Sequence, residues 1–181
     1  MRPILLAFVL LVNLIAVSGR AEDQPKPGPE HKALRLGLGE WTYLGVAHES
    51  PFGPAGKFQG RDSNRLILDG FFVETHWEDR SDTGFLAKGV VIRGYDAARK
   101  VYTATAYEND GSVTTDILTL DGKTWTTSGS RTASDGKVYK VRNSIAYADD
   151  ERSFNEKSEF SADGGQTWKV YYEMTAKKAK K

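Results

Sequence analysis

The sequence predicts an all-β fold: an up-and-down antiparallel β-barrel of about ten strands with a short N-terminal capping helix. From Trp41 onward, segments rich in β-branched and aromatic residues recur roughly every 8 to 12 residues, which is typical of a sandwich or barrel. Many of these segments are separated by Asp-Gly pairs, which favour tight hairpin turns. The pairs begin at Asp69, Asp110, Asp121, Asp135 and Asp163. No connection is long enough for a crossover helix, so successive strands should pair antiparallel and close into a barrel without exposed edges.

Composition favours one globular domain and argues against nucleic acid as a partner. The chain has 181 residues, of which 39% are hydrophobic and 27% charged, and its formal net charge is +1. This charge is too small for an electrostatic footprint on nucleic acid. The sequence contains no cysteine, so its stability must come from the core rather than from disulfides.

The N-terminus has the pattern of a secretory signal peptide. Met1 and Arg2 precede an apolar run from Ile4 to Val17, and small residues follow at Gly19 and Ala21. Cleavage is expected after Ala21, with Gly19 as the alternative last residue removed, which makes the protein secreted or periplasmic. An uncleaved membrane anchor is the alternative, but the run is shorter than the ~20 residues that a bilayer span needs. No stable membrane span is expected once the signal is removed.

Four segments follow from these patterns: a signal peptide at 1–21, a flexible leader at 22–28, a single barrel domain at 29–176 and a basic tail at 177–181. A helix is predicted from Pro29 to Leu38. It has proline at its first position, Glu30 in its first turn and Leu34 one turn before Leu38. Its apolar side is too small for a helical bundle, so we expect it to cover one end of the barrel.

The alternation of apolar and polar residues predicts which side chains face the interior. Around the turn at Asp69, one face is more apolar, and His76 lies on the other face. The predicted inner positions are Leu66, Leu68, Phe71, Val73, Thr75 and Trp77; Phe85, Ala87, Val91, Arg93 and Tyr95; Tyr139, Val141, Asn143, Ile145 and Tyr147; Phe154, Glu156, Ser158 and Phe160; and Trp168, Val170, Tyr172 and Met174.

This interior is mostly apolar but contains Arg93, Asn143 and Glu156, and buried charges require partners. One interpretation is that Arg93 and Glu156 satisfy each other or lie at a wet barrel mouth. The other is a ligand cavity, in which a few polar groups orient a small hydrophobic molecule. The candidate ligand-binding residues are Trp41, Tyr43, Trp77, Arg93, Asn143, Glu156 and Tyr172.

No catalytic or metal-binding signature occurs in the chain. A nucleophile elbow of the form Gly-x-Ser-x-Gly is missing. The three histidines, His31, His48 and His76, fall in different predicted elements, and no cysteine accompanies them. Glu74 and Glu156 lie on opposite predicted faces, which argues against a carboxylate pair for glycoside chemistry. The sequence therefore predicts no catalytic residue and no metal site, and it leaves enzymatic activity undecided.

The stretch from Ser161 to Trp168 resembles the Asp-box, the Ser-x-Asp-x-Gly-x-Thr-Trp hairpin of sialidases and many other β-proteins. In those proteins the hairpin is usually a folding element far from the active site. We therefore expect Asp163 to accept backbone amides and Trp168 to pack into the core.

Several motifs, taken in order, resemble a bacterial family catalogued as domain of unknown function 1579 (DUF1579). The motifs are Pro27 to His31, Gly39 to Trp41, Leu68 to Phe71, Gly94 to Asp96 and Ser161 to Trp168. The resemblance runs from Pro27 to about Thr175 and implies a secreted, lipocalin-like barrel with no established activity.

Gly39-x-Trp41 is also similar to the Gly-x-Trp that opens lipocalin and other calycin barrels, where the tryptophan plugs one end. The nitrobindins, a related barrel type, hold haem through a histidine late in the chain. Here no histidine follows His76, so no haem or other cofactor is predicted.

Three hypotheses for function remain. The first is a barrel that binds a small, mostly apolar ligand in its interior. The second is a packed barrel without a cavity that acts as a protein-interaction module, with an apolar surface patch at Pro51 to Pro54. The third is a hydrolase-type enzyme at the barrel mouth. The oligomeric state is open in all three.

Overall fold

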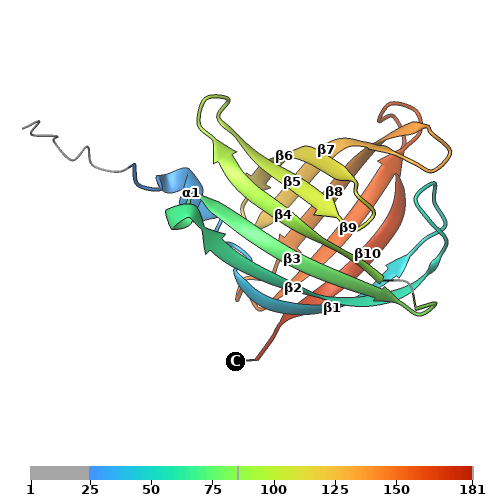
Figure 1. Cartoon of the computed structure of the whole chain (residues 1–181), viewed down its shortest axis with the longest axis horizontal. Coiled ribbons are helices and arrows are strands. Elements are labelled where there is room, and N and C mark those ends of the chain that lie inside the picture. Colours follow the sequence, from blue (N-terminus) through green and yellow to red (C-terminus); the bar gives the residue numbers. More distant parts are fainter. Residues whose placement is uncertain (1–24, 85, 181) are drawn as a thin grey trace, which may run out of the picture.

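The computed structural model describes residues 25–84 and 86–180 as a closed antiparallel barrel with a short helix at one end (Figure 1). The predicted all-β, up-and-down barrel is confirmed. The predicted signal peptide lies outside the described residues. None of the helical segments in the described part of the chain has the length and hydropathy of a membrane span.

The barrel consists of ten strands in sequence order, and helix α1 (Pro29–Ala33) precedes them. The strands are β1 (Gly39–Ala47), β2 (Gly56–Ile67), β3 (Phe72–Ser81), β4 (Leu86–Asp96), β5 (Val101–Glu108), β6 (Val113–Asp121), β7 (Thr124–Thr132), β8 (Val138–Tyr147), β9 (Ser153–Ser161) and β10 (Lys169–Lys178). A 3₁₀ turn, η1 (Leu68–Gly70), joins β2 to β3.

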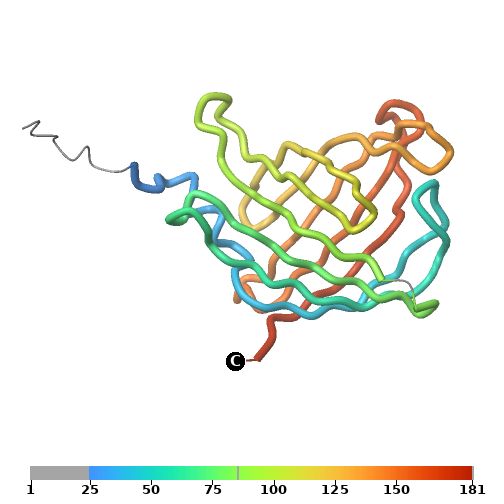
Figure 2. Tube along the Cα trace, viewed as in Figure 1, coloured from blue at the N-terminus to red at the C-terminus, as the bar shows by residue number. Residues whose placement is uncertain are grey.

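Each strand pairs with the next one along the chain, and β1 pairs with β10 to close the wall. The tube trace shows this path as a series of hairpins that return to the starting strand (Figure 2). In the closing pair, Trp41 lies opposite Lys178 and Ala47 lies opposite Tyr172. Closure removes both sheet edges, so the wall offers no unpaired strand to a neighbouring chain.

The segment around α1 covers one end of the barrel, as predicted, although α1 ends at Ala33 rather than at Leu38. Gly37 adopts a φ of +93°, a left-handed conformation that turns the chain into β1. Its carbonyl oxygen accepts a hydrogen bond of 2.8 Å from Trp41 Nε1. The Tyr102 hydroxyl donates to the Glu30 carbonyl oxygen at 3.1 Å, which ties the helix to β5. We call this region the capped end.

Apolar packing is densest at the capped end. Its buried residues include Leu34, Val73, Leu118 and Trp125, and Trp41 forms a neighbouring cluster with Phe154. A separate cluster lies at the opposite mouth and contains Tyr139, Val141 and Phe160. The ring of Phe52 packs there, 5.8 Å from that of Tyr139 and 5.1 Å from that of Tyr171. The predicted surface patch at Pro51 to Pro54 is therefore partly used to cover this mouth.

The turn after β2 places Leu68, a predicted inner residue, on the outside of the barrel. The register is as predicted, with Leu66 opposite Val73, but the connection is a 3₁₀ turn rather than a two-residue hairpin. Leu68 and Asp69 both have positive φ, at 49° and 57°. This conformation turns Leu68 outward, and the side chain is 67% exposed.

A β-bulge in β10 turns the first two residues of its predicted inner set, Trp168 and Val170, to the outside of the barrel. The register with β9 shifts between Val170 and Tyr172, so the extra residue Tyr171 turns toward the mouth cluster. Val170 pairs with the outward-facing Glu159, and Trp168 lies on the outer surface, with the Arg142 guanidinium carbon 4.3 Å from its ring centroid. The prediction that Trp168 packs into the core is wrong.

The hairpin that holds Trp168 is organised by Asp163. One carboxylate oxygen, Oδ1, accepts the backbone N–H groups of Gln166 and Thr167, and the other, Oδ2, accepts the Thr167 hydroxyl at 2.6 Å. The Ser161 hydroxyl also donates to Oδ1 at 2.6 Å, and this hydrogen bond together with those from Thr167 and Gln166 holds the pKa of Asp163 well below its usual range. The segment shapes the turn between β9 and β10, and β10 itself continues to Lys178, two residues beyond the predicted domain boundary.

Candidate functional site

The seven candidate residues face the barrel interior at different depths. Trp41 and Tyr43 are buried, at 1% and 5% exposure, in the aromatic cluster next to the capped end. Trp41 therefore has no free surface for a ligand and serves as the plug. Tyr43 presents its hydroxyl to the polar middle of the barrel, which we call the lumen. The other candidates are Trp77, Arg93, Asn143, Glu156 and Tyr172, and of these only Glu156 is fully buried.

Partial exposure of inward-pointing side chains indicates space inside the barrel. Trp77, Arg93, Asn143 and Tyr172 point away from the outer surface, yet each is only half-buried. In a solid core such side chains would be sealed by their neighbours, because protein interiors pack as densely as organic crystals. The lumen between the capped end and the opposite mouth therefore contains side-chain surface that solvent can reach.

Glycines in the wall help to keep the lumen open. Each is the direct cross-strand partner of an inward-facing ring: Gly60 of Tyr43, Gly45 of Phe58 and Gly89 of Trp77. A Cβ atom at any of the three positions would collide with that ring. The rings therefore lie along the wall, over backbone that lacks a side chain, instead of projecting across the barrel.

Arg93 on β4 is held by neutral oxygens. Its Nη2 donates to Asn64 Oδ1 at 2.9 Å and to Thr75 Oγ1 at 3.0 Å, and the Thr75 hydroxyl donates in turn to Asn64. Within residues 25–84 and 86–180, no carboxylate lies within 4.0 Å of the guanidinium. A guanidinium stays charged at any physiological pH, so Arg93 is an interior cation without a contacting anion.

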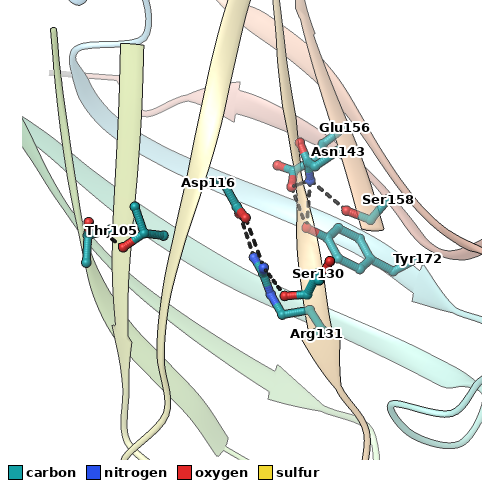
Figure 3. A network of polar contacts seen from close by, with 9 residues as sticks. Thr105, Asp116, Ser130, Arg131, Asn143, Glu156, Ser158 and Tyr172 are labelled. Carbon is teal, nitrogen blue, oxygen red and sulfur yellow. Dashed lines mark hydrogen bonds and ion pairs between the residues drawn. The ribbon is translucent and has the colours of Figure 1, made fainter. Parts of the chain in front are cut away.

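Glu156 on β9 is the centre of a second network, drawn in Figure 3. Its Oε1 accepts hydrogen bonds from the Tyr172 hydroxyl at 2.5 Å and from Asn143 Nδ2. Asn143 Nδ2 also contacts Ser158 Oγ at 2.6 Å and the Tyr172 hydroxyl oxygen at 3.0 Å. Burial raises the pKa of Glu156, and burial together with the neighbouring carboxylate raises that of Tyr172.

Arg93 and Glu156 therefore do not form the ion pair that one interpretation of the sequence proposed. Each lies in its own network of neutral groups, and the two make no contact within the ion-pair limit in the described part of the chain. The difference between them is chemical. Glu156 can avoid an unpaired buried charge by keeping its proton, whereas Arg93 cannot lose its own.

Two further carboxyl groups line the lumen. Burial, with a further contribution from the Glu156 charge, raises the pKa of Asp62 to about 7, although the nearby Arg93 charge opposes the shift. Asp79 accepts the Tyr43 hydroxyl, and burial also raises its pKa. Asp62 therefore gives the lumen a charge that varies around neutral pH.

A true buried ion pair joins β6 and β7. Asp116 accepts two hydrogen bonds from the Arg131 guanidinium, at 3.0 and 2.6 Å, in a bidentate arrangement (Figure 3). Because both charges are satisfied, this pair offers little to a ligand. Arg131 is thus an inward-facing arginine with a carboxylate partner, which Arg93 lacks.

Sequence reasoning missed several of these polar residues. Asn64 and Asp62 lie two and four residues before Leu66 in β2, on the same face of the strand. Extending the predicted inner face of β2 toward its N-terminus would have found them. Asp116 and Arg131 lie in β6 and β7, where no inner set was predicted. Their pairing depends on the register between two strands and carries no signal in either strand alone.

Two hollows lie on the wall outside the lumen, with volumes of about 550 and 800 Å³. Outward-facing residues of β1 to β5, such as Arg61, Glu78 and His76, form most of their lining. Among the described residues, no histidine, cysteine, aspartate and glutamate side chains gather into a group of three or more that would hold a metal ion.

The closed meander, the plugging tryptophan and the polar lumen define a lipocalin-like barrel. The chain belongs to the family described as Protein of unknown function (DUF1579), whose model matches residues 26–178. A comparison with curated proteins found no match.

The chain is also similar to solved structures. The crystal structure of Rv2717c from M. tuberculosis has a TM-score of 0.60 at 13% sequence identity, and the match covers 84% of this chain and 99% of that one. The S-type phycobiliprotein lyase CPES from Guillardia theta has a TM-score of 0.47 at 11% identity, covering 86% and 99%. At such identities the first likeness establishes the fold alone.

Proposed function

We propose that this protein binds a small, mostly apolar molecule in the lumen and holds an acidic group of that molecule at Arg93. The observation that carries the proposal is the guanidinium of Arg93, which has only neutral contacts inside the barrel. A half-buried charge without a contacting counter-charge is partly removed from water, and no ion pair compensates for that loss. A carboxylate or a similar anion on the ligand would supply the missing partner and gain charge-assisted hydrogen bonds.

The rest of the ligand would lie against the apolar lining of the lumen. Trp77, Ile145, Met174 and Phe58 are half-buried there, and the wall glycines let the rings of Phe58 and Trp77 lie close against the backbone. Apolar surface removed from water contributes about 25 cal/mol per Å², so a short hydrocarbon body would supply most of the affinity. Arg93 would then determine orientation and chemical selectivity.

The test uses pairs of ligands that differ only at the acidic group. A panel of alkyl and aryl carboxylic acids and their methyl esters is titrated into the purified protein, and tryptophan fluorescence reports binding at Trp77. We expect the acids to bind at least 10-fold more tightly than their esters, since a hydrogen bond to a charged group contributes about 1.5–3 kcal/mol.

Arg93→Gln is the decisive variant, because glutamine keeps hydrogen-bonding groups and loses the charge. It should bind the acids about 10- to 100-fold more weakly and leave the esters unchanged. Arg80→Gln, on an outward position of β3, is the matched control and should behave as wild type. Equal binding of acids and esters, or no binding across the panel by a folded protein, would contradict the proposal.

A further inference from the structure

The outer face of β4 to β7 carries no charged side chain over its central part. Buried Ala104, Asp116, Leu118 and Trp125 point inward, so the residues alternating with them point outward. From Val90 to Gly94, Thr103 to Tyr107, Val113 to Thr119 and Thr126 to Thr132, all outward residues are valine, isoleucine, glycine, threonine, serine or tyrosine. We call this surface the uncharged wall. The four strands form one continuous side of the barrel (Figure 1).

The rest of the barrel has the opposite character. Outward positions of β2 carry Lys57, Arg61 and Arg65, and those of β9 carry Lys157 and Glu159. Because 27% of the residues in the chain are charged, a face of four strands would ordinarily carry several charged side chains. Charges return only at the margins, as Lys88 and Asp96 in β4 and Asp121 in β6.

Exposed apolar side chains concentrate on the uncharged wall. Among the described residues seven large apolar side chains are exposed, and four of them lie on this wall or at its edge. Val113 is 59% exposed, Tyr107 50% and Ile117 44%, and Val138 begins the next strand. Tyr107 pairs directly with Val113, so two of them form one contiguous patch. A patch of this kind with a charged rim is the composition of a protein interface.

The hydroxyl groups on the wall do not all depend on water. Thr105 and Thr115 lie opposite each other, and their Oγ1 atoms are 3.0 Å apart in a hydrogen bond (Figure 3). A hydroxyl that is already paired costs little to remove from water. The wall can therefore be covered by another surface without leaving these groups unsatisfied.

We propose that the uncharged wall is the contact through which two copies of this chain form a two-fold dimer. In a two-fold contact the same patch meets itself, so any charge near the axis faces its own copy. A surface free of charge avoids that repulsion, whereas a different partner would match charges rather than require their absence. The chain's formal net charge of only +1 adds little long-range repulsion between copies.

The size of the wall indicates a weak, reversible dimer. The four segments of the wall contain five, five, seven and seven residues. At about 3.3 Å per residue and about 4.8 Å between strands, they cover roughly 380 Å² per copy. The two copies together would bury roughly 760 Å², which is below the ~1,000 Å² of a stable specific interface and fits a weak, transient contact. We therefore expect a dissociation constant in the micromolar range.

Sedimentation velocity on the folded chain, from about 1 µM to about 500 µM, spans the expected dissociation constant and tests the proposal. The wild type should shift from monomer to dimer across this range. Ile117→Lys places a charge in the centre of the wall and should remain monomeric at every concentration. Thr175→Lys adds the same charge to an exposed position of β10, outside the wall, and should dimerise as the wild type does.

Circular dichroism establishes that both variants are folded before they are compared. A wild-type protein that stays monomeric over the whole range overturns the proposal. So does an Ile117→Lys variant that dimerises with wild-type affinity, because the dimer would then use another surface. Neither result bears on ligand binding in the lumen, since the uncharged wall lies on the outside of the barrel.

Discussion

The capped end and the lumen are built from the same ten strands, yet one is packed and the other is open. At the capped end, inward positions carry large rings and branched side chains, and the segment around α1 fills the remaining space. In the lumen, inward positions of β1, β2 and β4 include Gly45, Gly60 and Gly89, and the polar residues contact one another across the strands. The choice of residue at inward positions therefore decides where the barrel is solid and where it is hollow.

The two regions also differ in their charged groups. At the capped end, the indole N–H of Trp41 has its acceptor in Gly37 and the Tyr102 hydroxyl has its acceptor in Glu30, whereas the buried indole N–H of Trp125 has no partner. In the lumen, Arg93 lacks an anion and Asp62 has a pKa near neutrality. Satisfied groups stabilise the fold, whereas unsatisfied ones reduce stability and remain available to a ligand.

The largest expected effect is at the capped end. Trp41→Ala removes a ring that is 1% exposed and the hydrogen bond to Gly37, so the free energy of unfolding should fall by about 3–5 kcal/mol. Urea denaturation measures the change. Trp168→Ala, on the outer surface, is the matched control and should cost less than about 1 kcal/mol. Equal losses in the two variants would show that Trp41 is not the plug of a packed end.

A smaller effect is expected in the wall of the lumen. Gly60→Ala adds a methyl group where the Tyr43 ring and Asp79 leave no space, and the strain should cost about 1–3 kcal/mol. Gly56→Ala, in the same strand, meets only the Asp82 carboxylate at 3.3 Å and should be nearly neutral. The same urea titrations apply. If the two alanines behave alike, the close approach of ring and glycine is not what shapes the lumen.

The smallest expected effect is a change in pH dependence. The pKa of Asp62 rises from 3.8 to about 7 on folding, so the folded state holds its proton over a range in which the unfolded state loses it. Stability contributed by this group is therefore complete below about pH 4 and is lost as the pH rises to about 7. A shift of about three pKa units corresponds to a change of at most about 4 kcal/mol in the free energy of unfolding. Because Asp62 is only half-buried, we expect a change of about 1–2 kcal/mol.

Asp62→Asn removes this dependence. Relative to wild type, the variant should become progressively more stable between about pH 4 and pH 7 and keep a constant advantage above that range. Stability curves measured at several pH values provide the comparison, and NMR titration of the Asp62 carboxyl in the wild type supplies an independent midpoint. Parallel stability curves for the two proteins would mean that Asp62 does not titrate as a buried group.

Much of the fold was readable from the sequence because its signals are local. Asp-Gly turns and two-residue alternation depend on neighbouring residues, and they predicted the meander, the inner positions from Ala87 to Tyr95 in β4, the inner sets of β8 and β9, and the outward position of His76. The predicted inner position Phe85 lies outside the described residues. The errors arose where the backbone departs from regular geometry. The 3₁₀ turn moved Leu68 outward, and the bulge at Tyr171 moved Trp168 and Val170 outward.

The candidate site was readable only in part. Alternation placed Arg93, Asn143 and Glu156 in the interior, but it carries no information about which strand lies across the barrel. Pairing Arg93 with Glu156 was the simplest way to satisfy two buried charges. The tertiary structure instead brings Arg93 to Asn64 and Thr75, and Glu156 to Asn143 and Tyr172, through registers between neighbouring strands.

By itself the sequence determined the strand order, the plugging role of Trp41 and the composition of the interior, because these depend on local conformation and burial. The signal peptide also depends on sequence alone and stays a prediction. Only the tertiary structure decided which interior charges are paired, where the lumen remains open and which outer wall is free of charge. Those properties depend on residues far apart in the chain that meet only when the barrel closes.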